Sequence, residues 1–158
     1  MEKVKAIPDG FSTVTPYLYF QGAAKAIDFY KNVFGATELM RMPGPDGKIM
    51  HAEIKIGDSR IMLGEENPQM GTLSPKSTEG SPLLLYVYAP DVDAVVEKAV
   101  KAGAKLDQPV KNQFYGDRAG SVTDPFGYKW FVATHVEDVA PEELKKRAAA
   151  MGRSAGAD

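Results

Sequence analysis

Two residues with the chemistry of a general acid or base lie close together in the segment 48–56. His51 and Glu53 are separated by one residue, in a run that alternates polar and apolar side chains. That alternation predicts a β-strand, in which both side chains point to the same face with Cα atoms roughly 6–7 Å apart. A carboxylate so placed can raise the basicity of the imidazole for acid–base work or ligand binding. The pair can equally be a structural hydrogen bond, and the sequence leaves both interpretations open.

Few other side chains offer comparable chemistry. The chain has two histidines and no cysteine, which excludes disulfides, thiolate zinc sites and a cysteine nucleophile. The second histidine, His135, is predicted to be structural and hydrogen-bonded near Glu137 or Asp138. The sequence contains no G-x-S-x-G nucleophile elbow, no phosphate-binding loop and no dinucleotide-binding glycine fingerprint.

Charge and hydropathy exclude further classes of function. The 158 residues carry a formal net charge of −2, which gives no electrostatic basis for binding nucleic acid or an anionic membrane. The first residues lack the apolar run of a signal peptide, and no apolar run approaches the length of a membrane span. With the absence of cysteine, these features predict a cytoplasmic protein with neither nucleic acid nor membrane as partner.

The elements that position these residues are predicted from periodicity and turn residues. Helices are expected at 22–34, 92–102 and 141–151, and the residues 152–158 are expected to be frayed. Asp91 is the predicted N-cap of the second helix. Residues 120–134 are predicted to form a hairpin whose turn begins at Asp124-Pro125, with Trp130 packed against a helix.

The same order of elements, β-α-β-β-β, is predicted twice. A shift of 69 residues relates Tyr17 to Tyr86 and Met62 to Phe131, and it also relates Tyr19 to Tyr88. This indicates duplication of a small module that cannot bury its own sheet. The predicted organisation is a leader at 1–12, a domain at 13–135 with module one at 13–65, a linker at 66–81 and module two at 82–135, and a C-terminal helix and tail at 136–158.

Four segments of the sequence resemble the vicinal oxygen chelate superfamily, which contains glyoxalase I, bleomycin-resistance proteins and extradiol dioxygenases. They read AAKAIDFYKNVFGA, HAEIKIGDSRIML, VDAVVEKAVKAGA and DPFGYKWFVAT. The segments YGDRAGSVTDPFGYKW and ATHVEDVAPEEL more narrowly resemble the PhnB-like branch. The resemblance implies an α+β fold in which two βαβββ modules form a U-shaped, partly closed mixed sheet around a cleft. It also implies a homodimer.

For that fold, strand parity predicts which side chains face the cleft. The four tyrosines of the repeat either form a stacking surface for a flat or apolar ligand or fill a barrel-like core. Arg118 either grips an anionic ligand group or forms an ion pair with Asp117 or Asp124. The predicted ligand-binding residues are Tyr17, Tyr19, His51, Glu53, Arg60, Met62, Tyr86, Tyr88, Tyr115, Arg118 and Phe131.

Metal-dependent members of the superfamily carry a histidine or glutamate at each of four cleft positions. Matching the motifs places Thr15, Met62, Leu84 and Phe131 at these positions. None except, weakly, Thr15 is a good ligand for a divalent metal. We therefore predict no metal site there and no cofactor, and leave open a divalent metal bound elsewhere.

Two functions follow as hypotheses, and the sequence does not decide whether a reaction is catalysed. The first is binding of a small aromatic or amphiphilic molecule in the cleft, as in drug-sequestering relatives. The alternative is a lyase, isomerase or dioxygenase-type enzyme. Its site would be a displaced metal or metal-free acid–base chemistry around His51 and Glu53.

Overall fold

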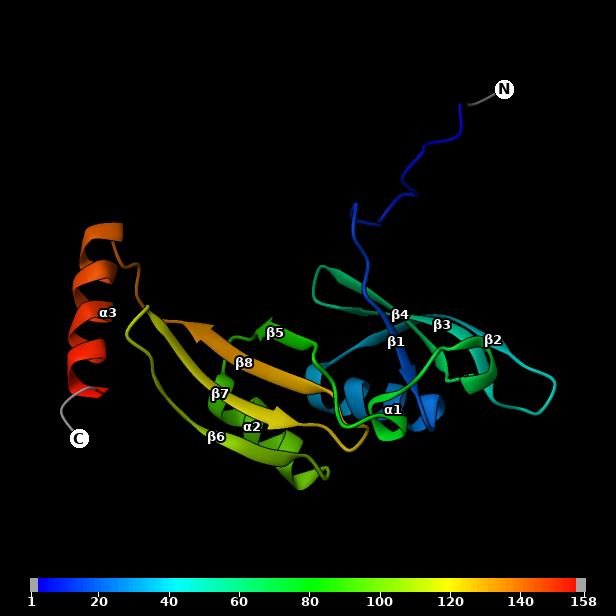
Figure 1. Cartoon of the computed structure of the whole chain (residues 1–158). Coiled ribbons are helices and arrows are strands. Elements are labelled where there is room, and N and C mark those ends of the chain that lie inside the picture. The colour runs from blue at the N-terminus through cyan, green and yellow to red at the C-terminus, as the bar shows by residue number, and fades with distance from the viewer. Residues whose placement is uncertain (1–2, 156–158) are drawn as a thin grey trace. The chain divides into compact units, whose positions relative to one another are not determined.

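The computed structural model describes residues 3–155, which form two units along the chain (Figure 1). The first unit comprises residues up to 82 together with 125–128, and the second comprises 83–124 together with the residues from 129 onward. Each unit contains one four-stranded mixed sheet and a helix that packs on it. None of the helices in the described part of the chain is long and apolar enough to cross a membrane.

Unit one begins with an irregular segment and continues into the first βαβββ module. Its sheet has the strand order β1-β4-β3-β2, in which β1 runs parallel to β4 and the other neighbours are antiparallel. Helix α1 lies against one face of this sheet (Figure 1). The elements are β1 (Tyr17–Phe20), α1 (Ala23–Phe34), β2 (Thr37–Pro43), β3 (Ile49–Ile56) and β4 (Ser59–Glu65).

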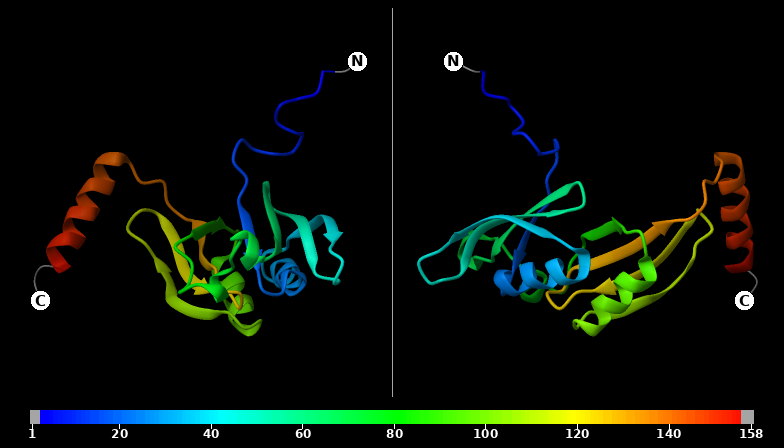
Figure 2. Two further views of the ribbon diagram at one scale, coloured as in Figure 1. Left: turned by 45° about the vertical axis from the view of Figure 1, so that its right-hand side comes forward. Right: turned by 180° about the vertical axis from the view of Figure 1, so that it is seen from behind.

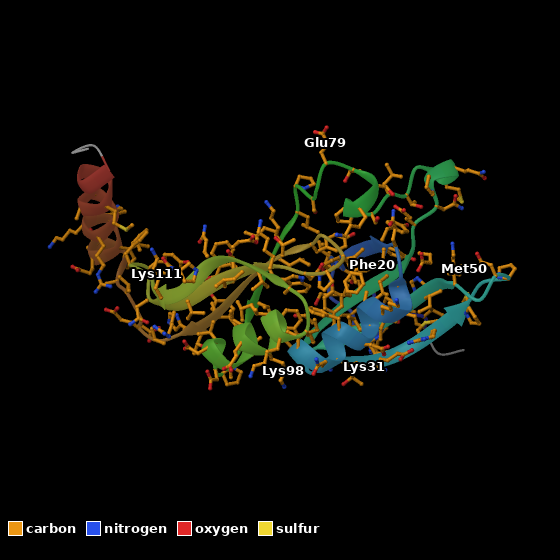
Figure 3. All side chains as sticks on the ribbon, turned by 90° about the horizontal axis from the view of Figure 1, so that it is seen from below. Phe20, Lys31, Met50, Glu79, Lys98 and Lys111 are labelled. Atoms are coloured by element: carbon orange, nitrogen blue, oxygen red, sulfur yellow. The ribbon has the colours of Figure 1, made fainter. Side chains whose placement is uncertain are left out.

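The core of unit one lies between α1 and its sheet. Leu18 and Phe20 of β1 are buried, whereas Tyr17, which was predicted to face the cleft, is 37% exposed. Phe20 contacts the rings of Tyr30 and Tyr128, at centroid distances of 6.0 and 5.1 Å. The labelled Phe20 points into this core, while Lys31 projects from the outer side of α1 (Figure 3).

Unit two repeats the architecture. Its sheet has the order β5-β8-β7-β6, with β5 parallel to β8 and the other neighbours antiparallel. Helix α2 covers one face, where Trp130 and Val132 are buried, and the views in Figure 2 show it along that sheet. The elements are β5 (Leu84–Tyr88), α2 (Val92–Lys101), β6 (Lys105–Asn112), β7 (Asp117–Thr123), β8 (Lys129–His135) and α3 (Pro141–Ala155).

The backbone register repeats together with the sequence. Tyr17 pairs with Met62 in unit one, and Tyr86 pairs with Phe131 in unit two, each across parallel strands. The predicted α+β fold of two βαβββ modules is therefore confirmed. It consists of two separate four-stranded sheets, and neither sheet closes on itself.

The two sheet-covering helices are capped differently. Asp91 caps α2 as predicted, because its side chain accepts a hydrogen bond from the amide of Ala94. Gly22, the N-cap of α1, has no side chain, and a residue distant in sequence supplies the acceptor. The carboxylate of Glu65 accepts hydrogen bonds from the amides of Gly22 and Ala23, at 2.9 and 2.6 Å.

Two segments are more regular than the sequence indicated. Helix α3 continues to Ala155, beyond the predicted end at 151, because residues 152–155 remain helical rather than frayed. The predicted polar linker at 66–81 contains two short 3₁₀ turns, η1 (Pro68–Met70) and η2 (Pro75–Ser77). The carboxylate of Glu66 ties this segment down, since it accepts from the amide of Ser74 and the hydroxyl of Ser77.

Candidate functional site

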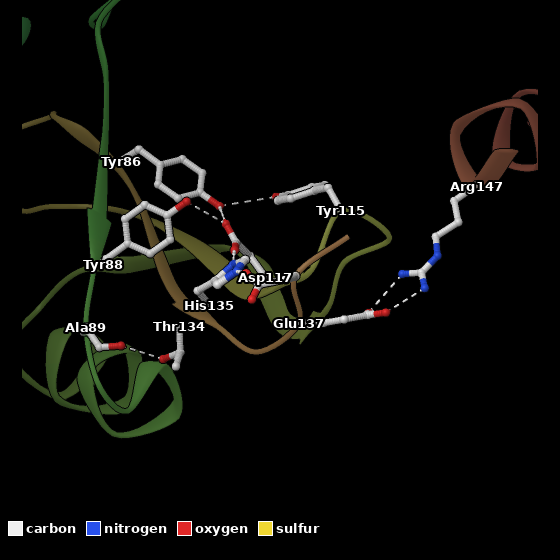
Figure 4. A network of polar contacts seen from close by, with 10 residues as sticks. Tyr86, Tyr88, Ala89, Tyr115, Asp117, Thr134, His135, Glu137 and Arg147 are labelled. Atoms are coloured by element: carbon white, nitrogen blue, oxygen red, sulfur yellow. Dashed lines mark hydrogen bonds and ion pairs between the residues drawn. The ribbon is translucent and has the colours of Figure 1, made fainter. Parts of the chain in front are cut away.

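A polar network centred on a buried carboxylate lies on the face of unit two opposite α2 (Figure 4). Asp117, the first residue of β7, has only 5% of its side chain exposed. One of its oxygens accepts from the hydroxyls of Tyr86 and Tyr88, at 2.7 and 3.0 Å. Its other oxygen lies 2.8 Å from Nδ1 of His135. Three side-chain donors on β5 and β8 therefore converge on a single acceptor.

The charge states of this network follow from its hydrogen bonds. Burial opposes ionisation of Asp117, but the bonds from His135, Tyr86 and Tyr88 outweigh it and hold the pKa of the carboxyl below its ordinary value. The pKa of His135 is raised by its hydrogen bond to Asp117 and, to a lesser extent, by its hydrogen bond to Asp138. Burial, together with the contacts to Tyr115 and Asp117, raises the pKa of Tyr86 well above its ordinary value. Asp117 is thus an anion, and the tyrosines keep their protons.

Aromatic rings surround this carboxylate and remain accessible. The rings of Tyr86 and Phe131 are stacked, with centroids 5.8 Å apart and an interplanar angle of 7°. The ring of Tyr88 lies 5.3 Å from that of Tyr86. Tyr86 is 41% exposed and Tyr88 62% exposed, so these rings do not fill a core. This finding favours the stacking-surface interpretation over the filled barrel for unit two.

Unit one carries a second network on the equivalent face. The hydroxyl of Tyr17 lies 2.9 Å from Nδ1 of His51, and Nε2 of His51 lies 3.4 Å from Oε1 of Glu53. The predicted pairing of His51 with Glu53 on one strand face is confirmed. Burial, and then the neighbouring Tyr19, raises the pKa of Tyr17. The rings of Tyr17 and Tyr19 are 4.8 Å apart.

One basic residue of this face, Arg60, contacts the leader segment. Nη1 of Arg60 lies 3.9 Å from the carboxylate of Glu53, and its guanidinium carbon lies 4.4 Å from the centroid of the Phe11 ring. Within the described residues, Nε of Arg60 is buried without a hydrogen-bond partner. Met62 occupies the same row of the sheet, because it pairs with Tyr17 on one side and Glu53 on the other.

Arg118 does not join the other predicted site residues. Alternation along β7 places it on the face that α2 covers, opposite Asp117. Its guanidinium binds Asp93 of α2 through two contacts of 2.8 Å, and it also donates to Asn112. The proposed ion pair with Asp117 or Asp124 was therefore wrong. The other predicted residues do lie on the helix-free faces, Tyr115 among them, with its hydroxyl 3.5 Å from that of Tyr86.

Sequence reasoning missed the centre of the network in unit two. Asp117 follows Gly116, directly after the turn that precedes β7. Parity along β7 would have placed it on the same face as Ser121, but the start of that strand carried no apolar alternation. His135 binds Asp138 through Nε2 at 2.7 Å, as predicted, whereas its contact with Asp117 was not foreseen.

Three of the four positions matched to the metal ligands of the superfamily carry side chains that do not fit a divalent metal. Met62 and Phe131 offer no oxygen or nitrogen ligand, and Leu84 is an exposed aliphatic side chain. No group of three or more histidine, cysteine, aspartate or glutamate side chains suited to a metal ion occurs among the described residues.

Two mixed sheets of paired βαβββ modules, each with an open polar face, define the class to which this protein belongs. The family model described as the Glyoxalase/Bleomycin resistance protein/Dioxygenase superfamily matches residues 13–132. The chain therefore belongs to this superfamily, and the resemblance to vicinal oxygen chelate proteins is confirmed.

Relatives support this assignment across most of the chain. An uncharacterised protein of Mycobacterium tuberculosis H37Rv is 39% identical over 142 residues, which cover 88% of this chain and 84% of that protein. The solved structure of an Arabidopsis thaliana protein has a TM-score of 0.63 at 28% identity, covering 78% of this chain and 98% of that one. A PhnB protein from Bacillus cereus has the same fold, with a TM-score of 0.63 at 18% identity, covering 78% of this chain and 99% of that one.

Proposed function

We propose that this protein binds small aromatic or amphiphilic molecules on the tyrosine-bearing face of unit two. The observation that carries the proposal is the accessible, stacked pair of Tyr86 and Phe131 beside the exposed ring of Tyr88. Large rings of this kind bury much apolar area against a flat ligand and lose little conformational entropy. The hydroxyls and Asp117 add polar groups that can fix the orientation of a ligand.

The test is a titration of the purified full-length chain with small aromatic compounds. Calorimetry on the wild type should detect binding, and Phe131→Ala should weaken it about tenfold or more, because the stacked ring is lost. Leu106→Ala is the matched control. It truncates an exposed apolar residue of β6 that pairs with Val122, whose side chain is buried on the helix-covered face. No binding by any compound, or equal loss in both variants, would contradict the proposal.

A second candidate function rests on the network of unit one. His51 is held between Tyr17 and Glu53, which is the arrangement of a general base oriented by a carboxylate. We propose metal-free proton transfer at His51 as this alternative. The imidazole of His51 would abstract a proton from the carbon atom next to a carbonyl group in a bound substrate.

Deuterium exchange distinguishes this alternative from simple binding. Carbonyl compounds incubated with the protein in D₂O should lose the proton signal of the adjacent carbon in NMR spectra. His51→Gln should slow this exchange by about 100-fold or more if the imidazole is the base. An absence of exchange above the protein-free rate would rule the alternative out.

We propose that the protein is cytoplasmic, that it forms a homodimer, and that its binding partner is a small molecule. Edge strand β5 carries Leu84, which is 47% exposed, and an apolar edge of this kind favours burial against another chain. Light scattering coupled to size-exclusion chromatography measures the oligomeric state directly. A monomer at micromolar concentration would contradict the dimer without affecting the binding proposal.

A further inference from the structure

The positions of the hydroxyl protons on the face of unit two follow from the partners that those hydroxyls have. Asp117 is ionised, and a carboxylate only accepts hydrogen bonds. Tyr86 and Tyr88 must therefore each donate their single hydroxyl proton inward to its Oδ2. Each phenolic oxygen is left with lone pairs and with no proton to offer outward.

The neighbouring groups reinforce this polarity. Because Tyr86 donates its hydroxyl proton in the hydrogen bond to Asp117, Tyr115 is the donor in the 3.5 Å contact between the hydroxyls of Tyr86 and Tyr115. Both nitrogens of His135 face carboxylates, those of Asp117 and Asp138, so both N–H groups donate to them. An imidazolium between two carboxylates leaves the cluster with a net charge of about −1.

The surface around Asp117 therefore combines aromatic rings, hydroxyl oxygens that only accept, and the net negative charge of this cluster. Such a surface disfavours carboxylates and phosphates, since these ligands bring acceptors and negative charge. It favours a positively charged donor next to a flat apolar body, because ammonium groups bind both to acceptor oxygens and to aromatic faces. Three lysines also lie on this face. Lys129 of β8 pairs with Leu84, at the opposite end of β5 from Tyr88, and Lys105 and Lys111 belong to the far edge strand β6.

We propose that the ligand of this face is an aromatic amine, whose ammonium group donates hydrogen bonds to the hydroxyl oxygens of Tyr86 and Tyr88 while its ring stacks on the Tyr86–Phe131 pair. This inference rests on the binding function proposed above and names the ligand class for it. It assigns the selectivity for donors over acceptors to Asp117, which contacts the ligand only through the two tyrosines. Asp117 is thus a positioning residue for specificity.

Three probes of the same ring system test the inference by calorimetry on the full-length chain at neutral pH. They are 2-naphthylmethylamine, its N,N,N-trimethyl analogue and 2-naphthoic acid. The amine should bind at least about tenfold more tightly than the naphthoate, because one charge-assisted hydrogen bond is gained and a repulsion is avoided. The trimethyl analogue keeps the charge but has no N–H, and it should bind more weakly than the amine.

The outcomes separate this inference from the function on which it rests. Failure of all three probes to bind would overturn both. Naphthoate binding as tightly as the amine would overturn the inference and leave aromatic binding standing. Equal affinity of the amine and its trimethyl analogue would also overturn the inference, because donor recognition would then contribute nothing.

Asp117→Asn tests the positioning role. The amide can donate to the tyrosine oxygens, which frees their protons to point outward, and the preference for amine over naphthoate should fall about tenfold. Asp93→Asn is the matched control: it makes the same exchange in the carboxylate that holds Arg118 on the opposite face, and the preference should persist. If Asp117→Asn does not fold, Tyr88→Phe, which removes one acceptor and keeps the ring, should weaken the amine more than the naphthoate. An unchanged preference in a folded variant would overturn the inference.

Discussion

The two modules use equivalent tyrosines with different polar partners. In unit one the hydroxyl of Tyr17 contacts the imidazole of His51, and in unit two Tyr86 donates to the carboxylate of Asp117. The strand registers show that these partners are not at equivalent positions. Ala52 pairs with Leu63 and Gly120 with Val132, so the position of His51 is filled by Ala119 in unit two, and that of Asp117 by Ile49 in unit one. The duplicated scaffold thus fixes where the rings lie, while each module supplies its own polar partner.

Removing the polar partner of the tyrosine in each module should produce the largest difference between the modules. Asp117→Ala leaves two hydroxyls and an imidazolium without their buried partner, and should destabilise the protein by about 2–3 kcal/mol. His51→Ala should cost only about 1 kcal/mol, because water can reach the hydroxyl of the exposed Tyr17. Urea denaturation of the two variants beside the wild type measures both values. Equal destabilisation would show that Asp117 contributes no more to the free energy of unfolding than His51 does.

The helix caps offer a second comparison of the modules. Glu65→Ala removes the shared acceptor of two amides at the start of α1 and should destabilise unit one by about 1–2 kcal/mol. Asp91→Ala removes the cap of α2, which accepts from the amide of Ala94, and should cost about 1 kcal/mol. Chemical denaturation followed by hydrogen exchange can assign each loss to its helix. Protection lost in α2 after Glu65→Ala would contradict the assignment.

The network of unit two should add pH dependence near neutrality. Folding raises the pKa of His135 above its ordinary 6.5, because Asp117 and then Asp138 accept hydrogen bonds from its N–H groups. The stabilisation is therefore fully present below about pH 6.5 and is lost as the pH rises through the folded value. The difference in unfolding free energy between the wild type and His135→Gln should thus shrink as the pH rises from 6 to 9. A difference that grows with pH would have the wrong sign for this network.

The smallest expected effect lies in the linker that follows unit one's sheet. Hydrogen bonds from Ser77, the amide of Ser74 and Gln21 outweigh burial and lower the pKa of Glu66 from 4.5 to about 2. The contribution is present above about pH 4.5 and is lost as the pH falls through about 2. Hydrogen exchange of the Ser74 amide should accelerate, relative to its intrinsic rate, as the pH falls through that range. It should also accelerate at neutral pH in the Glu66→Gln variant. Protection that persists in the variant would show that the 3₁₀ turns hold the segment without this carboxylate.

Local signals made much of the fold predictable. Alternation in β1 and β3 gave the buried and exposed faces correctly, and Asp91 was recognisable as a cap because it binds an amide three residues away. The 69-residue shift predicted the repeated pairing of Tyr17 with Met62 and Tyr86 with Phe131. These features depend on neighbours in sequence or on a repeated pattern, and both are visible without coordinates.

The partners that come from distant segments were not predictable in this way. Glu65 caps a helix more than 40 residues earlier in the chain, and Asp117 meets tyrosines that are separated from it by a helix and a strand. Arg118 was misassigned because its partner, Asp93, depends on which face of β7 is covered by α2. Pairing of long polar side chains follows from packing, which the sequence pattern specifies only after the register is known.

The location of a bound aromatic ligand tests the central claim most directly. NMR titration of the isotope-labelled chain with 2-naphthylmethylamine should shift the ring signals of Tyr86, Tyr88 and Phe131. The backbone signals of β5 and β8 should move with them. Ring-current shifts confined to these residues are the predicted result. Saturable shifts that spare these three rings, or no saturable shift at all, would contradict the account.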